Sequence, residues 1–351
     1  LADINGNGEL EILATTEIYN DTPTLTAFEY NGAEFAPSNL GVEQAYRFSA
    51  LDVDNDSDLD LVGALAEDKQ LVWLEPRRSD VPTLDSLSDV TIDEDAPAQT
   101  VELSGITAGI GRGPGVITKI ELDPGSAGSD PVSFQQLTPE LVLFAATTEA
   151  SGRELWKTDG TQAGTSMLKD LRPGSDSSHP HALTQVGDSV FFVANNSEDV
   201  AQVWVSDGTE AGTQMLTNFT GHLDPPRSFT ALGDRLMFKT NTQSQGTELW
   251  TSDGTPEGTV MVKDLIPGSF GSNPESMVVW NDKLYFRAQP GAGQPTTLWE
   301  SDGTEGGTVN LAVPAWELLK FDHGVIAEDS DTLRYFNGTE TVVIATPGIT
   351  A

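Results

Sequence analysis

The sequence predicts an all-β protein, a β-propeller-like array of about seven short antiparallel blades. The first observation behind this is a motif, Leu/Val-Trp-x-x-Asp-Gly-Thr, whose four tryptophans lie 48, 46 and 49 residues apart. A fixed period of this length indicates a repeat architecture. These tryptophans are Trp156, Trp204, Trp250 and Trp299.

The other two observations concern the turns between the strands. Turn signals recur every 8–12 residues or so between short valine-, threonine- and aromatic-rich runs, which is typical of a β-meander. The chain also holds 34 glycines and 20 prolines, residues that tight turns require. Because one meander cannot bury both faces, stacking the units radially is the favoured solution. A right-handed β-helix is the alternative, but its coils are usually shorter and lack hairpin turns.

Charge and composition exclude several classes of protein. Acidic residues outnumber basic ones by 54 to 18, a formal net charge of −36, and such a surface repels nucleic acid. Divalent cations are the natural counter-species, and a solvated acidic surface without metal is the alternative. No run approaches the roughly 18 apolar residues of a membrane span. The chain has no cysteine, which excludes disulfides and thiol catalysis.

Two acidic loops near the amino terminus predict calcium sites. Residues 3–13 and 52–62 each place oxygen-bearing side chains at alternate positions and then continue as a strand. Calcium takes six to eight or so oxygen ligands, which a tight loop can supply from alternate positions. An Asx-rich turn without metal is the alternative. The candidate ligands are Asp3, Asn5, Asn7 and Glu11 in the first loop, and Asp52, Asp54, Asp56 and Asp60 in the second.

The segments after these loops are strand-like. Residues 24–30 end at Asn31-Gly32, a strong hairpin signal, and residues 70–75 end at Pro76. Both units resemble the FG-GAP or VCBS repeats of extracellular β-propellers, whose loops bind calcium. Residues 52–62 and 72–75 carry the resemblance, which departs at Ser57, where the family usually has glycine.

The segment 79–116 reads as a linker. Residues 87–103 resemble the first strands of a cadherin-like domain, but a sandwich needs about 100 residues, so we expect a remnant. The glycine-rich run 109–115 is a flexible breaker, and no Lys-Ser/Thr follows it to make a phosphate loop.

Residues 117–351 hold the repeated units. Each unit is expected to contain a Pro-Gly turn, a serine-rich segment, a strand with an aromatic centre, the Trp strand, the Asp-Gly-Thr turn and a last strand. We expect each tryptophan to lie in the core between blades and each Asp-Gly-Thr to form a turn with positive φ at glycine. These units resemble the ELWxxDGT repeats of large secreted bacterial proteins. The resemblance covers 123–313, and the unit at 314–351 is degenerate because it keeps Asn337-Gly338-Thr339 but lacks the tryptophan.

The predicted domains are therefore 1–78, two FG-GAP/VCBS-like calcium-loop blades; 79–116, the linker; and 117–351, an ELWxxDGT propeller of four to five blades. About seven units of roughly 50 residues could close one ring, whereas the interrupting middle favours two partial propellers. Residue 1 already lies inside a motif and no signal peptide precedes it, so we expect a fragment of a longer precursor with other domains.

No catalytic motif stands out. The four histidines lie beside neither a Gly-x-Ser-x-Gly elbow nor a His-Glu-x-x-His helix, although His179 and His181 could together hold a metal. The sequence predicts a non-catalytic, calcium-stabilised extracellular adhesion or interaction module of a secreted or cell-surface bacterial protein, with an unknown protein or polysaccharide as its partner. One alternative is a polysaccharide-acting enzyme or carbohydrate-binding propeller with an acidic central pocket. A purely structural spacer is the other.

Overall fold

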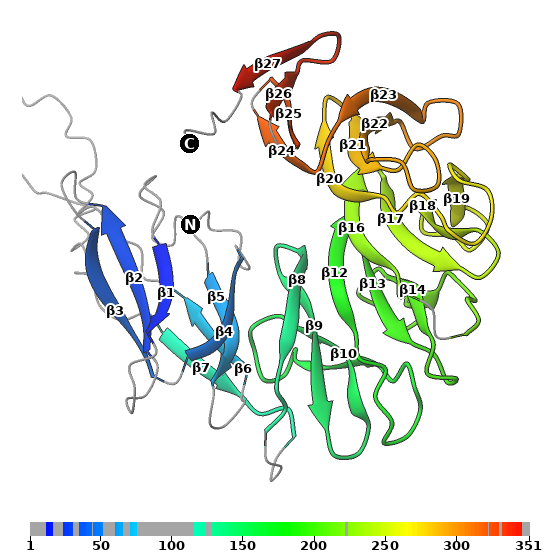
Figure 1. Ribbon diagram of the computed structural model, residues 1–351. Coiled ribbons are helices and arrows are strands. Elements are labelled where there is room, and N and C mark those ends of the chain that lie inside the picture. The colour runs from blue at the N-terminus through cyan, green and yellow to red at the C-terminus, as the bar shows by residue number, and fades with distance from the viewer. Residues whose placement is uncertain are drawn as a thin grey trace, which may run out of the picture. The chain divides into compact units, whose positions relative to one another are not determined.

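The chain consists of β-strands in every part that the structure describes (Figure 1). The structure is a computed structural model, and it divides into two compact units, residues 1–121 and 122–351. No helix in the described residues is long and apolar enough to cross a membrane. The described residues are 12–16, 24–30, 35–43, 45–51, 60–65, 71–75, 116–123, 128–221, 224–321, 323–329 and 332–345.

The first unit contains two antiparallel sheets. One sheet has the order β1-β2-β3, from β1 (Ile12–Thr16), β2 (Thr24–Tyr30) and β3 (Phe35–Glu43). The other has the order β4-β5-β6-β7, from β4 (Ala45–Leu51), β5 (Asp60–Leu65), β6 (Leu71–Glu75) and β7 (Val116–Ile120). The strands predicted after the two acidic loops are therefore confirmed as β1 and β5.

The second unit contains five four-stranded antiparallel sheets in its described residues. The first is β8 (Val132–Thr138), β9 (Leu141–Thr148), β10 (Gly152–Thr158) and β11 (Ser166–Lys169); the second is β12 (His181–Val186), β13 (Ser189–Asn195), β14 (Ala201–Ser206) and β15 (Gln214–Met215). The third is β16 (Arg227–Leu232), β17 (Arg235–Thr242), β18 (Gly246–Ser252) and β19 (Val260–Lys263). The fourth is β20 (Glu275–Trp280), β21 (Lys283–Ala288), β22 (Thr297–Ser301) and β23 (Val309–Pro314); the fifth is β24 (Glu317–Phe321), β25 (Gly324–Asp329), β26 (Thr332–Phe336) and β27 (Thr341–Ala345).

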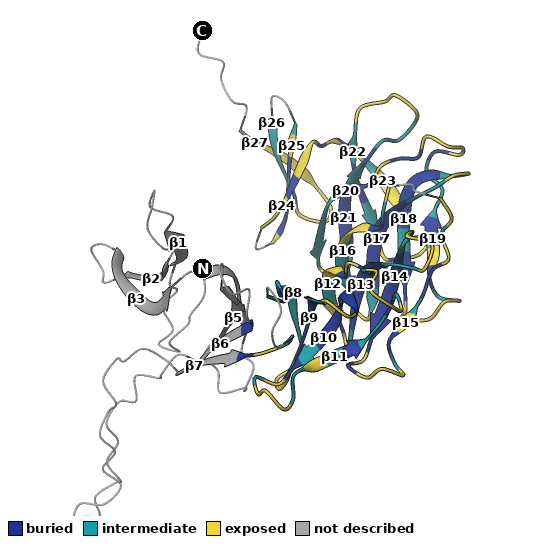
Figure 2. Cartoon of the chain, turned by 90° about the horizontal axis from the view of Figure 1, so that it is seen from below, coloured by how far each residue is buried: buried dark blue, intermediate teal, exposed yellow. Residues whose placement is uncertain are grey.

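Consecutive sheets of the second unit meet along their first strands. β8 contacts β12, β12 contacts β16, β16 contacts β20 and β20 contacts β24, so these five strands form the inner side of a radial array. Apolar residues of each sheet pack against the next sheet, and Figure 2 shows the buried residues concentrated in the middle strands. This arrangement confirms the predicted all-β, β-propeller fold.

Three of the four motif tryptophans are buried in the core, as predicted, and Trp250 is partly buried against it. Trp204 packs with Leu143 and Leu155 of the preceding sheet, and it stacks on Phe192 of β13 at a centroid distance of 6.3 Å. Trp299 stacks on Phe286 in the same way. Burying side chains of this size stabilises the fold by roughly 1.5–3 kcal/mol or more each.

The Asp-Gly-Thr turns close on themselves. In the third sheet the Asp253 carboxylate accepts hydrogen bonds from the Thr255 amide at 3.0 Å and hydroxyl at 2.7 Å, and Gly254 has a φ of 88°. The carboxylate also fills the space beside Gly258, where an added Cβ would lie 2.0 Å from it. This contact explains the glycine of the Gly-Thr pair that follows each turn, and the Thr259 hydroxyl donates to the Thr255 carbonyl at 2.7 Å. The equivalent pairs are Asp159 with Gly164, Asp207 with Gly212 and Asp302 with Gly307.

The degenerate fifth repeat keeps this turn chemistry. Asn337 replaces the aspartate, and its side-chain oxygen accepts hydrogen bonds from the Thr339 amide at 3.1 Å and hydroxyl at 3.0 Å. Gly338 has a φ of 92°. The predicted turn is therefore confirmed in a sheet that lacks the tryptophan.

Lysines on two outer strands connect neighbouring sheets. The Lys263 ammonium on β19 donates to the Thr308 carbonyl at 2.9 Å and the Glu305 carbonyl at 3.4 Å in the next sheet. Lys169 on β11 makes the same contacts with Glu210 and Thr213. The sequence motif did not indicate this role, because donor and acceptor lie more than 40 residues apart.

Candidate functional site

A buried glutamate at the start of the motif holds the loop that leads into the next sheet. In the first sheet, Glu154 is fully buried and accepts hydrogen bonds from the Leu171 amide at 2.8 Å and from the Ser178 amide at 2.9 Å and hydroxyl at 2.7 Å. Burial raises the pKa of the Glu154 carboxyl, although these hydrogen bonds lower it. None of these partners is a cation, so the hydrogen bonds from the loop offset the cost of burying the Glu154 carboxylate.

The third sheet repeats this arrangement. Glu248 accepts hydrogen bonds from the Ile266 amide at 3.3 Å and from the Ser272 amide at 2.8 Å and hydroxyl at 2.5 Å, and burial raises its pKa as well. The loops held in this way contain the predicted Pro-Gly turns, with a φ of 111° at both Gly174 and Gly268.

The held loops cover the outer edge of the motif strand. The Ser178 amide donates to the Arg153 carbonyl at 3.1 Å, and the Asn273 amide donates to the Thr247 carbonyl at 3.0 Å. This close approach requires glycine: an added Cβ on Gly152 would lie 2.8 Å from the backbone of the loop, and one on Gly246 would lie 2.3 Å from it. In the first and third sheets, therefore, the strand edge is filled by the protein's own loop.

The second sheet departs from this pattern at each point. Gln202 takes the place of the glutamate, and its side-chain oxygen accepts from the Thr217 hydroxyl and the Phe219 amide, each at 2.8 Å, while its amide donates to the Phe219 carbonyl at 2.9 Å. Val200 takes the place of the glycine, two residues earlier. No Pro-Gly turn occurs between Asp207 and Arg227, so a different loop follows a different path.

As a result, none of the described loop residues pairs with the edge of β14 at Ala201. The Asn195 amide, opposite Ala201 in the register, donates to the Ser178 carbonyl at 2.7 Å, so the two residues form a non-hydrogen-bonded pair. The N–H and C=O of Ala201 therefore point away from β13. No residue that the structure describes forms a hydrogen bond with them there.

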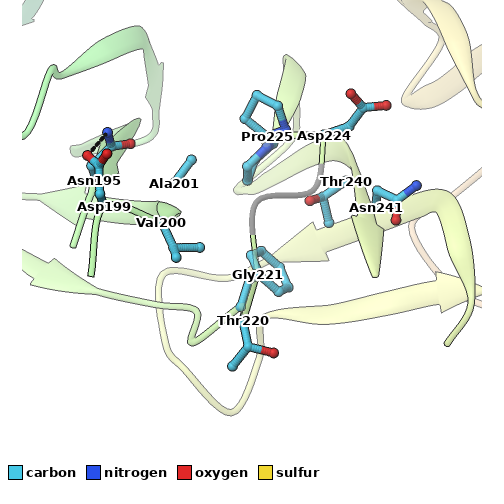
Figure 3. Close-up of a pocket in the computed structure, with 12 residues that line it drawn as sticks. Asn195, Asp199, Val200, Ala201, Thr220, Gly221, Asp224, Pro225, Thr240 and Asn241 are labelled. Carbon is cyan, nitrogen blue, oxygen red and sulfur yellow. Dashed lines mark hydrogen bonds between the residues drawn. The ribbon is translucent and has the colours of Figure 1, made fainter. Parts of the chain in front are cut away.

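The free edge opens into a groove (Figure 3). We call it the β14 groove, lined by Val200, Ala201, Phe219, Asp224, Thr240 and Asn241 among others; it encloses about 180 Å³. Figure 3 shows Val200 and Ala201 across from Thr240 and Asn241. Two further hollows share its walls, one through Phe219 and Asn241 and the other through Asp224 and Thr240. This is an elongated, open groove rather than the enclosed pocket of a small-molecule site.

The rim of the groove is acidic. The Asp199 carboxylate lies 2.8 Å from the Arg172 guanidinium and accepts a hydrogen bond from Asn195 at 3.0 Å. The Asp224 carboxylate lies 3.3 Å from the guanidinium of Arg227. Because both carboxylates are more than half exposed, these ion pairs contribute little to stability and the oxygens stay accessible to another cation.

One end of the groove is fixed by a half-buried charge network. The Lys239 ammonium lies 3.0 Å from the Glu275 carboxylate, which also pairs with Arg287. Although partial burial raises the pKa of Glu275, these two cations hold it below its usual value. Two cations face one carboxylate here, so this end carries a local positive charge.

Most of the predicted calcium ligands are not among the described residues. Asp3, Asn5, Asn7, Glu11, Asp52, Asp54 and Asp56 lie outside the described residues, and Asp60 is the first residue of β5. Within the described part of the chain, no group of three or more His, Asp or Glu side chains is arranged to hold a metal. His181 is oriented by the His179 carbonyl, 2.9 Å from its Nδ1.

No protein-family model and no curated protein matches this chain. Several solved structures share its fold. A puromycin hydrolase complexed with PGG matches with a TM-score of 0.51 and 14% identity over 97% of this chain and 54% of that chain. A puromycin-hydrolyzing peptidase of Mycobacterium tuberculosis matches with a TM-score of 0.47 and 10% identity over 98% of this chain and 53% of that one. The β-propeller domain of the Trilobed protease of Pyrococcus furiosus matches with a TM-score of 0.41 and 11% identity over 96% and 98% of the two chains.

These structures correct one prediction from the sequence. The prediction of a non-catalytic adhesion module is wrong, because the structure that aligns with this chain at a TM-score of 0.51 is that of an enzyme, puromycin hydrolase. At this identity the likeness shows the fold alone, and this chain spans about half the length of the two hydrolases. The repeat motif led to the error because it specifies strands and turns, which propellers of many functions share.

Proposed function

We propose that this chain is a peptidase-related propeller that binds polypeptide in the β14 groove. The observation that carries the proposal is the unpaired backbone edge at Ala201, which borders the β14 groove. In the first and third sheets, the protein's own loops cover the equivalent edge. A free strand edge recognises polypeptide through its main chain. The puromycin hydrolase that shares the fold is an enzyme, which agrees with a propeller that receives a substrate.

We assign to this propeller the part of a hydrolase that receives polypeptide. Acyl transfer needs a nucleophile within hydrogen-bond reach of a base. This chain spans 54% of the length of the puromycin hydrolase that shares its fold, so we propose that the groups that cleave the bond belong to another domain.

We further propose that calcium bound at residues 3–11 and 52–60 stabilises the first unit and that the protein is secreted. The support is the alternation of oxygen ligands in both loops. Extracellular calcium would also offset part of the net charge of −36.

A binding assay tests the proposed function. Fluorescently labelled unstructured peptides and labelled oligosaccharides are titrated with the purified chain, and the peptides are analysed afterwards by mass spectrometry. We expect peptides to bind and to remain intact. Binding of the oligosaccharides alone, or of neither ligand, would contradict the proposal, and cleaved peptides would overturn the assignment of a binding role only.

A further inference from the structure

The first and third sheets show what the edge of a motif strand accepts. At Thr247, residues 271–273 run along the strand: Thr247 forms a parallel bridge with Gly271, and the Asn273 amide donates to the Thr247 carbonyl at 3.0 Å. At Arg153, the Ser178 amide donates to the carbonyl at 3.1 Å and the Ser177 hydroxyl accepts from the amide at 2.9 Å. In both cases a segment of the protein's own loop forms backbone contacts along the edge.

From this internal precedent, and resting on the proposed function, we infer that the β14 groove binds a basic polypeptide segment in extended conformation. The segment pairs as a short parallel strand with the N–H and C=O of Ala201. In the second sheet, the ligand lies beside Ala201 as residues 271–273 lie beside Thr247 in the third sheet. Strand addition of this kind satisfies backbone groups that are otherwise left to water.

The departure at Val200 determines how far the pairing extends. An added Cβ at the equivalent Gly246 would lie 2.3 Å from the backbone of the adjoining segment, so a bound chain cannot follow that path past Val200. It must leave the edge after Ala201 and pass over the side chains of Val200 and Phe219, which line the groove. The ligand therefore makes a short main-chain contact followed by an apolar one.

The charge of the groove selects a basic segment. Asp199 and Asp224 lie among the lining residues on either side of the free edge, and both side chains are more than half exposed. The chain as a whole carries a net charge of −36, which attracts cations and repels acidic peptides. Lysine or arginine side chains on either side of the paired residue can reach these carboxylates.

Four peptides and three variants test this inference. Three of the peptides have equal length and are basic, acidic and neutral. The fourth has the sequence of the basic peptide but is N-methylated at its central amides. The variants are Ala201→Pro, which removes the outward N–H, Asp224→Lys, and the control Glu257→Lys, which changes the charge by the same amount at an exposed position among the Asp-Gly-Thr turns. Thermal melting establishes that each variant is folded.

Fluorescence anisotropy at low salt should rank the basic peptide first and the acidic peptide last. N-methylation and Ala201→Pro should each weaken binding about three- to tenfold, the equivalent of one hydrogen bond. Asp224→Lys should weaken the basic peptide about fivefold or more, and Glu257→Lys less than about twofold. If Ala201→Pro does not fold, the N-methylated peptide still decides the result.

The outcomes separate the two proposals. Equal binding of the basic peptide with and without N-methylation, or of all peptides regardless of charge, would overturn the inference and leave polypeptide binding intact. An equal effect of Asp224→Lys and Glu257→Lys would show general attraction to the protein rather than binding in the β14 groove, and so would also overturn it. Failure of every peptide to bind would overturn the proposed function as well.

Discussion

Replacing the buried carboxylate of Glu154 tests how the propeller loops are held. The substitution Glu154→Ala removes an acceptor from the Leu171 amide and from the Ser178 amide and hydroxyl. The Leu171 amide is left unpaired, whereas the Ser178 amide and hydroxyl keep the Arg153 carbonyl at 3.1 and 3.3 Å. A buried donor left unpaired costs about 1–3 kcal/mol, and each further lost hydrogen bond about 0.5–1.5 kcal/mol. Removal of a buried charge recovers part of this sum, so we expect a net loss of about 2–4 kcal/mol in the free energy of unfolding.

Urea unfolding followed by tryptophan fluorescence measures this loss, since Trp156 lies two residues away. The control is Glu140→Ala, a substitution of the same type at an exposed turn position, which should change stability by less than about 0.5 kcal/mol. In a unit of this size, the expected loss lowers the melting temperature by roughly 6–15 °C. A change of less than about 1 kcal/mol for Glu154→Ala would refute the conclusion that this carboxylate holds the loop.

Three further predictions concern pH, the contacts between sheets and calcium. Because burial raises the pKa of Glu154 and Glu248 above 4.5, their contribution to stability is full below the unfolded pKa and is lost as pH rises through the folded pKa. From pH 4.5 upward, the wild type should therefore lose more stability than the double variant Glu154→Gln with Glu248→Gln. Urea unfolding at several pH values measures this, and equal slopes of the free energy of unfolding against pH would contradict it. Lys263→Met should lower the free energy of unfolding by about 1–2 kcal/mol, because it removes donors to two carbonyls of the next sheet; a neutral result in the same assay would argue against the inter-sheet contact. In calorimetry, calcium added to chelator-treated protein should release heat with a dissociation constant of roughly 10⁻⁴–10⁻³ M. The double variant Asp52→Ala with Asp54→Ala should remove the heat from the second loop. The absence of heat, together with a melting temperature that the chelator does not change, would contradict the calcium prediction.

The features predicted well from the sequence depend on contacts between neighbours in the chain. Asp253 and Gly258 are five residues apart, so their shared turn is visible in one short motif. Trp204 and its partner Phe192 lie on adjacent hairpin strands. Such contacts repeat in every unit and are therefore read directly from the period.

The inner strands were harder to find. β12 and β16 carry mostly exposed or half-buried side chains, so they lack the continuous apolar run of β13 or the aromatic signature of β14. Their residues contact the inner strands of neighbouring sheets, which are distant in the sequence. The residue pattern of a single strand does not reveal such contacts between sheets.

The groove was missed for a similar reason. Glu154 and Ser178 are 24 residues apart, so the contact that holds the loop is not evident from the motif. A signal was nevertheless present: the second repeat combines Gln202 at the glutamate position with the loss of the Pro-Gly turn, and the fourth repeat, with Thr297 at that position, also lacks the turn. Two departures in the same repeat indicate that the loop after the motif follows a different path.

Hydrogen exchange of the Ala201 amide tests the central claim most directly. We expect this amide to exchange freely in the unbound protein and several-fold more slowly once the basic peptide occupies the β14 groove. The Arg153 amide, already covered by the Ser177 hydroxyl at 2.9 Å, should be unchanged and serves as the internal control. A bound peptide that leaves the exchange of Ala201 unaltered would contradict the account.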